Sequence, residues 1–192
     1  MSRRLAPVAL VALPALALAV AGLFHPHHLT YDTSWRWYTL HLPGLVVFPL
    51  VGASLAALVR GRSDSLAWAV RLAAYVYATF YTALDVISGV AAGFVTHRLG
   101  PGVPRPEAVS QLFRIGTPLG EIGSWALIAA TLALLVDRVI STRRSIVTLA
   151  GGVLVLPGAW LVHQGHIFAP EGVVGMLLIG LGSAGLEATR RK

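Results

Sequence analysis

Long runs of apolar residues occupy most of the chain, and short segments that hold most of the charged residues separate them. A helix needs about 20 mainly apolar residues to cross the roughly 30 Å hydrocarbon layer of a bilayer, where only helices or closed barrels satisfy the backbone polar groups. Six runs reach or approach this length, so the sequence predicts an all-α, polytopic membrane bundle that forms a single transmembrane domain over residues 1–192. The predicted spans are Leu5–Phe24, Leu40–Val59, Leu72–Val95, Pro118–Val136, Ile146–Val162 and Gly172–Leu186.

The composition excludes an ordinary water-soluble fold. Of the 192 residues, 56% are hydrophobic and 12% are charged, and the mean hydropathy is +0.73, whereas a soluble domain has about 25% charged residues. The absence of cysteine excludes disulfides, iron–sulfur clusters, thiolate zinc sites and cysteine nucleophiles. The net charge is +7, but the basic residues stand singly or in pairs between the apolar runs. This placement favours a membrane over nucleic acid as the partner.

The positions of Lys and Arg predict the orientation of the chain. With the N-terminus in the cytoplasm, 11 of the 15 basic residues fall on the inner side, in agreement with the positive-inside rule. The sequence therefore predicts that the N- and C-termini are both cytoplasmic, and its bias toward Arg, Ala, Leu, Val and Gly points to a bacterial inner membrane. The inner residues are Arg3, Arg4, Arg60, Arg62, Arg71, Arg138, Arg143, Arg144, Arg190, Arg191 and Lys192, and the outer ones are Arg36, Arg98, Arg105 and Arg114.

The first span has an alternative interpretation as a secretory signal. Two arginines precede its apolar run, and Ala19-Val20-Ala21 is typical of a small-residue cleavage site. Cleavage would leave five spans with the C-terminus still inside, so the charge pattern does not distinguish the two interpretations.

Two outer connections have some length. His25–Thr39 is rich in Tyr and Trp, which favours a position along the membrane surface. Thr96–Thr117 begins with Gly and Pro and continues with an apolar pattern after Pro106, which predicts one short interfacial helix.

Asp85 is the most informative polar residue inside a predicted span. It lies near the middle of the third span, where an ionisable group costs about 2.5 to 3.5 kcal/mol on insertion scales. Three polar residues share its helical face: Tyr77, Tyr81 and Ser88. Asp85 is expected to point into the bundle, either as a hydrogen-bonding contact between helices or as a proton-relay group, ligand contact or metal ligand.

All seven histidines fall on the predicted outer side. His163 and His166 end the fifth span with a spacing that places two imidazoles on one helical face. His41 begins the second span and Glu121 the fourth, so these four side chains are expected to converge on one Zn, Cu or Fe ion. Interfacial hydrogen bonding and a single haem are the alternatives. The remaining histidines, expected in solvated or headgroup-facing loops, are His25, His27, His28 and His97.

The function predicted from these residues is that of a membrane protein with an outward-facing polar site. No nucleotide-binding motif, HExxH motif or recognisable Ser/His/Asp spacing occurs in the sequence. We favour a metal-dependent membrane hydrolase or a metal-handling protein over a small-solute transport component and over a structural subunit. Membrane lipid and a small-molecule or lipid ligand are the expected partners, with a partner subunit as a further option. The candidate catalytic residues are Asp85 and Glu121, the candidate metal ligands are His41, Glu121, His163 and His166, and the candidate pocket residues are Tyr81, Trp125 and Trp160.

Overall fold

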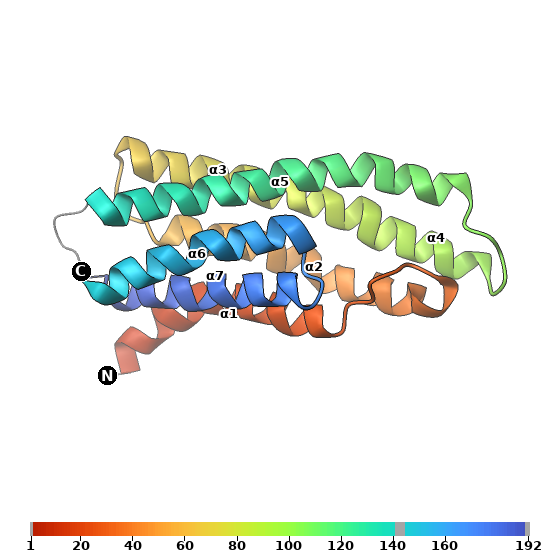
Figure 1. The fold of residues 1–192 in the computed structure, drawn as a ribbon, viewed down its shortest axis with the longest axis horizontal. Helices are drawn as coiled ribbons and strands as arrows, with labels where there is room; N and C mark the ends of the chain where they lie inside the picture. The colour runs from red at the N-terminus through yellow and green to blue at the C-terminus, as the bar shows by residue number, and fades with distance from the viewer. Residues whose placement is uncertain (1, 141–144, 191–192) are drawn as a thin grey trace.

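The protein is a bundle of helices packed side by side (Figure 1). The structure, a computed structural model, describes residues 2–140 and 145–190, and every regular element in these two ranges is helical. The elements are α1 (Ser2–Leu23), α2 (Tyr31–Ala57), α3 (Ser65–Leu84), the π-helix η1 (Asp85–Ala91), α4 (Ala92–Leu99), α5 (Glu107–Ile140), α6 (Ile146–Gly165) and α7 (Glu171–Ala188).

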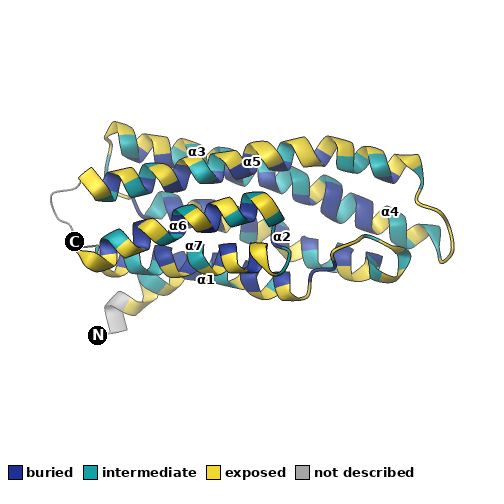
Figure 2. Cartoon of the chain, in the orientation of Figure 1, coloured by how far each residue is buried: buried dark blue, intermediate teal, exposed yellow. Residues whose placement is uncertain are grey.

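Six helical segments in the described ranges are long and apolar enough to cross a membrane. One of them is the continuous segment Ser65–Leu99, which contains α3, η1 and α4. The outward faces of the bundle are exposed along its length (Figure 2) and carry large apolar side chains such as Leu10, Leu72 and Leu181. These findings confirm the predicted all-helical bundle and support a multi-pass integral membrane protein.

Two helices begin much earlier than the sequence pattern predicted, and α3 also starts early, at Ser65 instead of Leu72. α2 starts at Tyr31, where Thr30 and Thr33 form a capping box, so the aromatic segment expected along the membrane surface is the first part of this helix. α5 starts at Glu107 and continues through Pro118, so the expected short interfacial helix is joined to the following span. Packing explains the second difference, because Val109 in this added part of α5 is fully buried.

The bundle combines three long helical segments with three short ones. α2, Ser65–Leu99 and α5 contain 27, 35 and 34 residues, and α1, α6 and α7 contain 22, 20 and 18. At a rise of about 1.5 Å per residue, the long segments measure roughly 40 to 53 Å and the short ones roughly 27 to 33 Å. The short helices match the hydrocarbon thickness of a bilayer, and the long ones extend past them at one end, around α4 (Figure 1).

Glycines allow close contact between α6 and α7. A Cβ atom added at Gly158 would lie 2.7 Å from the carbonyl oxygen of Gly175, and one added at Gly151 would lie 2.9 Å from that of Gly182. Any larger residue at these positions would push the two backbones apart. The glycines of the last span therefore let α6 and α7 pack closely together.

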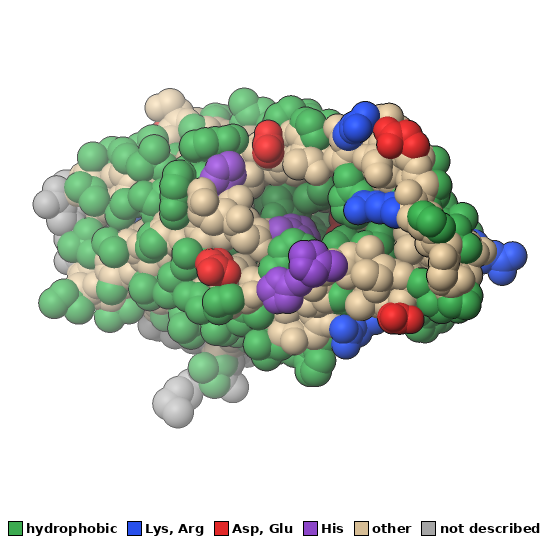
Figure 3. Space-filling model, turned by 45° about the vertical axis from the view of Figure 1, so that its right-hand side comes forward, with side chains coloured by type: hydrophobic (Ala, Val, Ile, Leu, Met, Phe, Trp, Pro, Cys, Tyr) green, Lys and Arg blue, Asp and Glu red, His purple; other side chains and the backbone are tan. Residues whose placement is uncertain are grey.

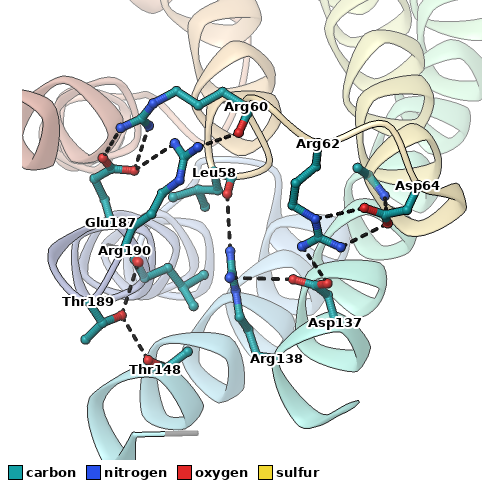
Figure 4. A network of polar contacts seen from close by, with 12 residues as sticks. Leu58, Arg60, Arg62, Asp64, Asp137, Arg138, Thr148, Glu187, Thr189 and Arg190 are labelled. Atoms are coloured by element: carbon teal, nitrogen blue, oxygen red, sulfur yellow. Dashed lines mark hydrogen bonds and ion pairs between the residues drawn. The ribbon is translucent and has the colours of Figure 1, made fainter. Parts of the chain in front are cut away.

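An ionic network closes the end of the bundle at which both chain termini lie (Figures 1 and 4). Arg62 lies 2.7 Å from the Asp137 carboxylate and 2.9 Å from that of Asp64, and Arg60 pairs with Glu187. Contacts with Arg62 hold the pKa of the Asp64 carboxyl at about 2. The network ties the α2–α3 connection to α5 and α7. Four of the basic residues assigned to this side lie outside the described residues: Arg143, Arg144, Arg191 and Lys192.

Candidate metal site

Three histidines from distant parts of the chain meet where the short helices end. His25 follows α1, His41 lies inside α2, and His166 comes directly after α6. One ring nitrogen of each lies within 4.8 Å of those of the other two. The Nε2 atoms of His25 and His41 are 3.4 Å apart. These three residues are called the histidine triad below, and they can hold a metal ion.

Backbone carbonyls determine which nitrogens of His25 and His41 face each other. The Nδ1 atom of His25 lies 2.8 Å from the carbonyl oxygen of Pro26, and that of His41 lies 2.6 Å from the carbonyl oxygen of Trp37. A carbonyl oxygen only accepts, so in both contacts Nδ1 carries the hydrogen and donates it. In the neutral rings, Nε2 then bears the lone pair, and two lone pairs face each other across 3.4 Å. A cation between them removes this repulsion.

His166 is positioned by the end of α6 and by a tyrosine. The helix ends at Gly165, and His166 adopts a φ of 51°, in the left-handed region that few residues other than glycine occupy. Its Nδ1 atom lies 2.8 Å from the hydroxyl of Tyr81 on α3. When Nδ1 donates to this hydroxyl oxygen, Nε2 is the nitrogen left with the lone pair.

Burial keeps the rings of His25 and His166 neutral. The pKa of His25 is lowered to about 4, mainly by burial and then by the neighbouring His41. The pKa of His166 is lowered well below its usual range by burial, and further by His25 and His41. The ring nitrogens therefore remain unprotonated near neutral pH, which is the state that binds metals.

Asp85 lies beside the triad with no hydrogen-bonding partner among the described residues. Its Oδ1 atom is 3.7 Å from Nε2 of His41, the residue is 1% exposed, and neither carboxylate oxygen makes a hydrogen bond. A buried carboxylate in this state is costly unless a cation or a proton compensates it. The unpartnered oxygens therefore call for a cation or a proton beside the triad.

The π-helix that begins at Asp85 packs closely against the part of α2 that carries His41. π-helical turns are frequent at functional sites, and here the carbonyl of Ser88 accepts a hydrogen bond of 3.0 Å from the indole of Trp37. A Cβ atom at Gly89 would lie 2.1 Å from the His41 ring, and one at Gly44 would lie 2.6 Å from the Asp85 carboxylate. Only glycine leaves room for both side chains at these two positions.

A cavity of about 320 Å³ adjoins the triad. Figure 3 shows this side of the molecule hollowed, with histidine side chains beside the hollow. His41 and His166 of the triad line the cavity, together with Tyr81, Glu121 and His163. The remaining lining residues mix apolar and polar side chains: Trp37, Leu84, Ser88, Gly89, Phe113, Thr117, Gly120, Ser124, Val162, Gln164, Gly165 and Phe168.

The structure divides the residues that the sequence grouped into one metal shell. His41 and His166 are in the triad, whereas His163 is outside it and contacts the Ser124 hydroxyl at 2.8 Å. Glu121 is exposed at the cavity edge. The candidate pocket residues Trp125 and Trp160 do not line the cavity. Both side chains are about half exposed, and the two rings contact each other and the ring of His163.

The candidate ligand that the sequence analysis missed is His25. It was expected in an exposed loop because Pro26 and two further histidines follow it, yet it is 5% exposed. Its ring packs edge-on against Trp37, His41 and Phe168. The available signal was its position directly after an apolar span, at the level of His41.

Comparison with known protein families, curated proteins and solved structures found no match.

Proposed function

We propose that the protein is a membrane-embedded metalloenzyme that holds one zinc-type ion at His25, His41 and His166. The observation that carries the proposal is the 3.4 Å separation of two Nε2 atoms whose lone pairs face each other. Two imidazoles bound to one tetrahedral Zn²⁺, each at 2.0 to 2.1 Å, hold their nitrogens about 3.3 Å apart. The spacing in the protein therefore fits two ligands of a single ion.

The donor set supports Zn²⁺ among the transition metals. Three neutral imidazoles with a nearby carboxylate, in a chain without cysteine, resemble catalytic rather than structural zinc sites, which keep one coordination position open. His41 and His166 line the cavity, so that position has space next to it. The carbonyls of Pro26 and Trp37 and the hydroxyl of Tyr81 supply the outer contacts that fix ligand rings in metal sites.

The open cavity and the free carboxylate favour hydrolysis as the reaction. A bound Zn²⁺ supplies Lewis-acid activation of a carbonyl group and of water. Asp85, whose Oδ1 atom lies 3.7 Å from Nε2 of His41, is the residue that we propose accepts the proton of the attacking water as the water oxygen bonds to the acyl carbon. The bond from the acyl carbon to the leaving oxygen or nitrogen then breaks, and Asp85 returns the proton to that atom.

We infer that the site faces the outer side of a bacterial inner membrane and that both termini are cytoplasmic. The inference is supported by the arginines around the end of the bundle where the termini lie, opposite the triad (Figures 1 and 4).

The test is the metal content of detergent-purified protein. We expect about one zinc per chain, and a loss of affinity of at least about 100-fold in each of His25→Ala, His41→Ala and His166→Ala. His163→Ala is the matched control, because this histidine faces the same cavity from outside the triad. Equal binding by the triad variants and the native protein would contradict the proposal. Folding of each variant is verified by its thermal transition without metal.

A further inference from the structure

The exposed part of the cavity lining lies on two helices, α5 and α6. Three of its lining residues are exposed: Thr117 and Glu121 on α5, and Gln164 near the end of α6. These residues are here called the mouth. Since α5 and α6 are both candidate membrane spans, the mouth lies between two membrane helices.

The mouth lies at the level where the bilayer changes from hydrocarbon to headgroups. α6 is a 20-residue helix that ends at Gly165, directly after Gln164, and its length matches the hydrocarbon layer. α5 continues past this level, because its first ten residues precede Thr117. A lipid headgroup is therefore at the same depth as the mouth and the triad.

An exposed aromatic pair borders the mouth on its hydrocarbon side. Trp125 lies one turn beyond Glu121 on α5, and Trp160 lies one turn before Gln164 on α6. Their ring centroids are 6.2 Å apart, and about half of each side chain is exposed. The two rings form an apolar surface that leads from the bilayer to a polar rim.

The interior of the cavity suits an amphipathic molecule. Its lining combines polar side chains, among them His41, His166 and Ser124, with apolar side chains such as Leu84, Phe113 and Val162. A molecule with a polar group near His41 and His166 and a chain passing Trp125 and Trp160 would meet matching surfaces along its length.

We propose that the substrate of this site is a membrane lipid, which enters sideways between α5 and α6 with its polar end toward the histidine triad and its acyl chain against Trp125 and Trp160. This inference rests on the proposed metal site, because the metal defines the end of the cavity at which the polar group binds. It extends the proposed function by naming the class of substrate and its route.

The test compares two zinc-binding probes that differ in chain length, acetohydroxamate and palmitohydroxamate. The full-length protein is loaded with Co²⁺ in place of Zn²⁺ and inserted into phosphatidylethanolamine–phosphatidylglycerol nanodiscs, and the visible Co²⁺ band reports ligation of each probe. Binding is compared between the native protein and the Trp125→Ala/Trp160→Ala variant. Trp68→Ala is the matched control, since Trp68 is 61% exposed on α3, at the start of this helix and near the ionic network.

We expect the double substitution to weaken palmitohydroxamate about tenfold and to leave acetohydroxamate and the metal content unchanged. Partitioning of the long probe into the bilayer is the same for both proteins, so it does not produce this difference. Trp160→Leu, which keeps an apolar side chain, is expected to give a smaller change of the same kind, and it replaces the double variant if that variant does not fold.

Two other results have different meanings. In the first, the native protein binds Co²⁺, and the tryptophan substitutions change the binding of both probes equally. This result would overturn the lipid route and leave the metal site intact. A native protein with no Co²⁺ band would overturn the proposed function and, with it, this inference.

Discussion

The orientation of each ring in the triad depends on the contact made by its Nδ1 atom. Trp37 makes two of the hydrogen bonds around the site. Its carbonyl accepts one from His41, and its indole donates one to the Ser88 carbonyl in the π-helix. Trp37 therefore links the orientation of His41 to the helix that carries Asp85. Such outer contacts typically change metal affinity 10- to 100-fold when they are lost.

Asp85→Asn tests whether this carboxylate acts as a base. Asparagine keeps the shape of the side chain and removes its ability to take a proton, so we expect kcat/KM for p-nitrophenyl acetate to fall about 10²- to 10⁴-fold with unchanged zinc content. Asp64→Asn is the control, because it lies in the ionic network at the other end and asparagine also caps helices well. Loss of zinc from Asp85→Asn would show instead that Asp85 is a metal ligand.

Part of the site could be predicted from single residues and part could not. His41 and His166 stand at the ends of apolar spans, and an imidazole at such a boundary is readable from the sequence. His25 stands in a connection whose path over α2 depends on tertiary packing against Trp37 and Phe168. The separation of His163 from the triad follows from the end of α6 at Gly165, which turns His166 away from the helical face that holds His163.

At the scale of elements, the π-helix is the feature that sets the site apart from the rest of the bundle. Three of its seven residues belong to the site. Asp85 lies next to His41, and Ser88 and Gly89 line the cavity. Apolar periodicity does not distinguish α from π turns, so the sequence predicted the span and not this irregularity. The early start of α5 was missed for a related reason, because an amphipathic segment next to a span is typical of both an interfacial helix and a longer span.

Gly89→Ala tests the role of the π-helix. The added methyl group would lie 2.1 Å from the His41 ring, so the ring must move, and we expect zinc affinity to fall at least about tenfold in a folded protein. Gly185→Ala is the control, because its added methyl group would meet its nearest neighbours at an ordinary 3.7 Å. Unchanged zinc affinity in Gly89→Ala would show that the close fit of this glycine is unimportant for the metal.

At the scale of the whole molecule, the two ends of the bundle have different chemistry. One end is fastened by arginine–carboxylate contacts (Figure 4), and the other carries the neutral histidines and the cavity. The apolar runs and the distribution of basic residues predicted this division, because both are properties of long stretches of sequence. The difference in length between the short and the long helical segments depends on helix ends that the pattern does not locate.

Asp137→Ala tests whether the ends are independent. The substitution leaves Arg62 and Arg138 without their shared carboxylate, and we expect the free energy of unfolding to fall by about 1 to 3 kcal/mol. Zinc affinity is expected to stay the same, since distant sites are usually additive. Thermal unfolding and a zinc titration on the same sample measure both quantities. A parallel loss of zinc affinity would contradict the independence of the two ends.

Metal removal should affect the stability of the whole bundle. Because the triad joins residues after α1, in α2 and after α6, a bound ion links three helices. Zinc at 100 times its Kd should stabilise the native protein by about 2.7 kcal/mol. We expect chelation to lower the thermal midpoint of the native protein and not that of His41→Ala. An equal response of the two proteins to chelator would argue against a metal that links these helices.

The most direct test of the central claim is zinc X-ray absorption spectroscopy of the metal-loaded protein. A metal held by His25, His41 and His166 predicts a nitrogen shell at about 2.0 to 2.1 Å with the multiple-scattering pattern of three imidazoles, and a reduced imidazole count in His25→Ala. A first shell without imidazole, or an identical spectrum from His25→Ala, would contradict the account.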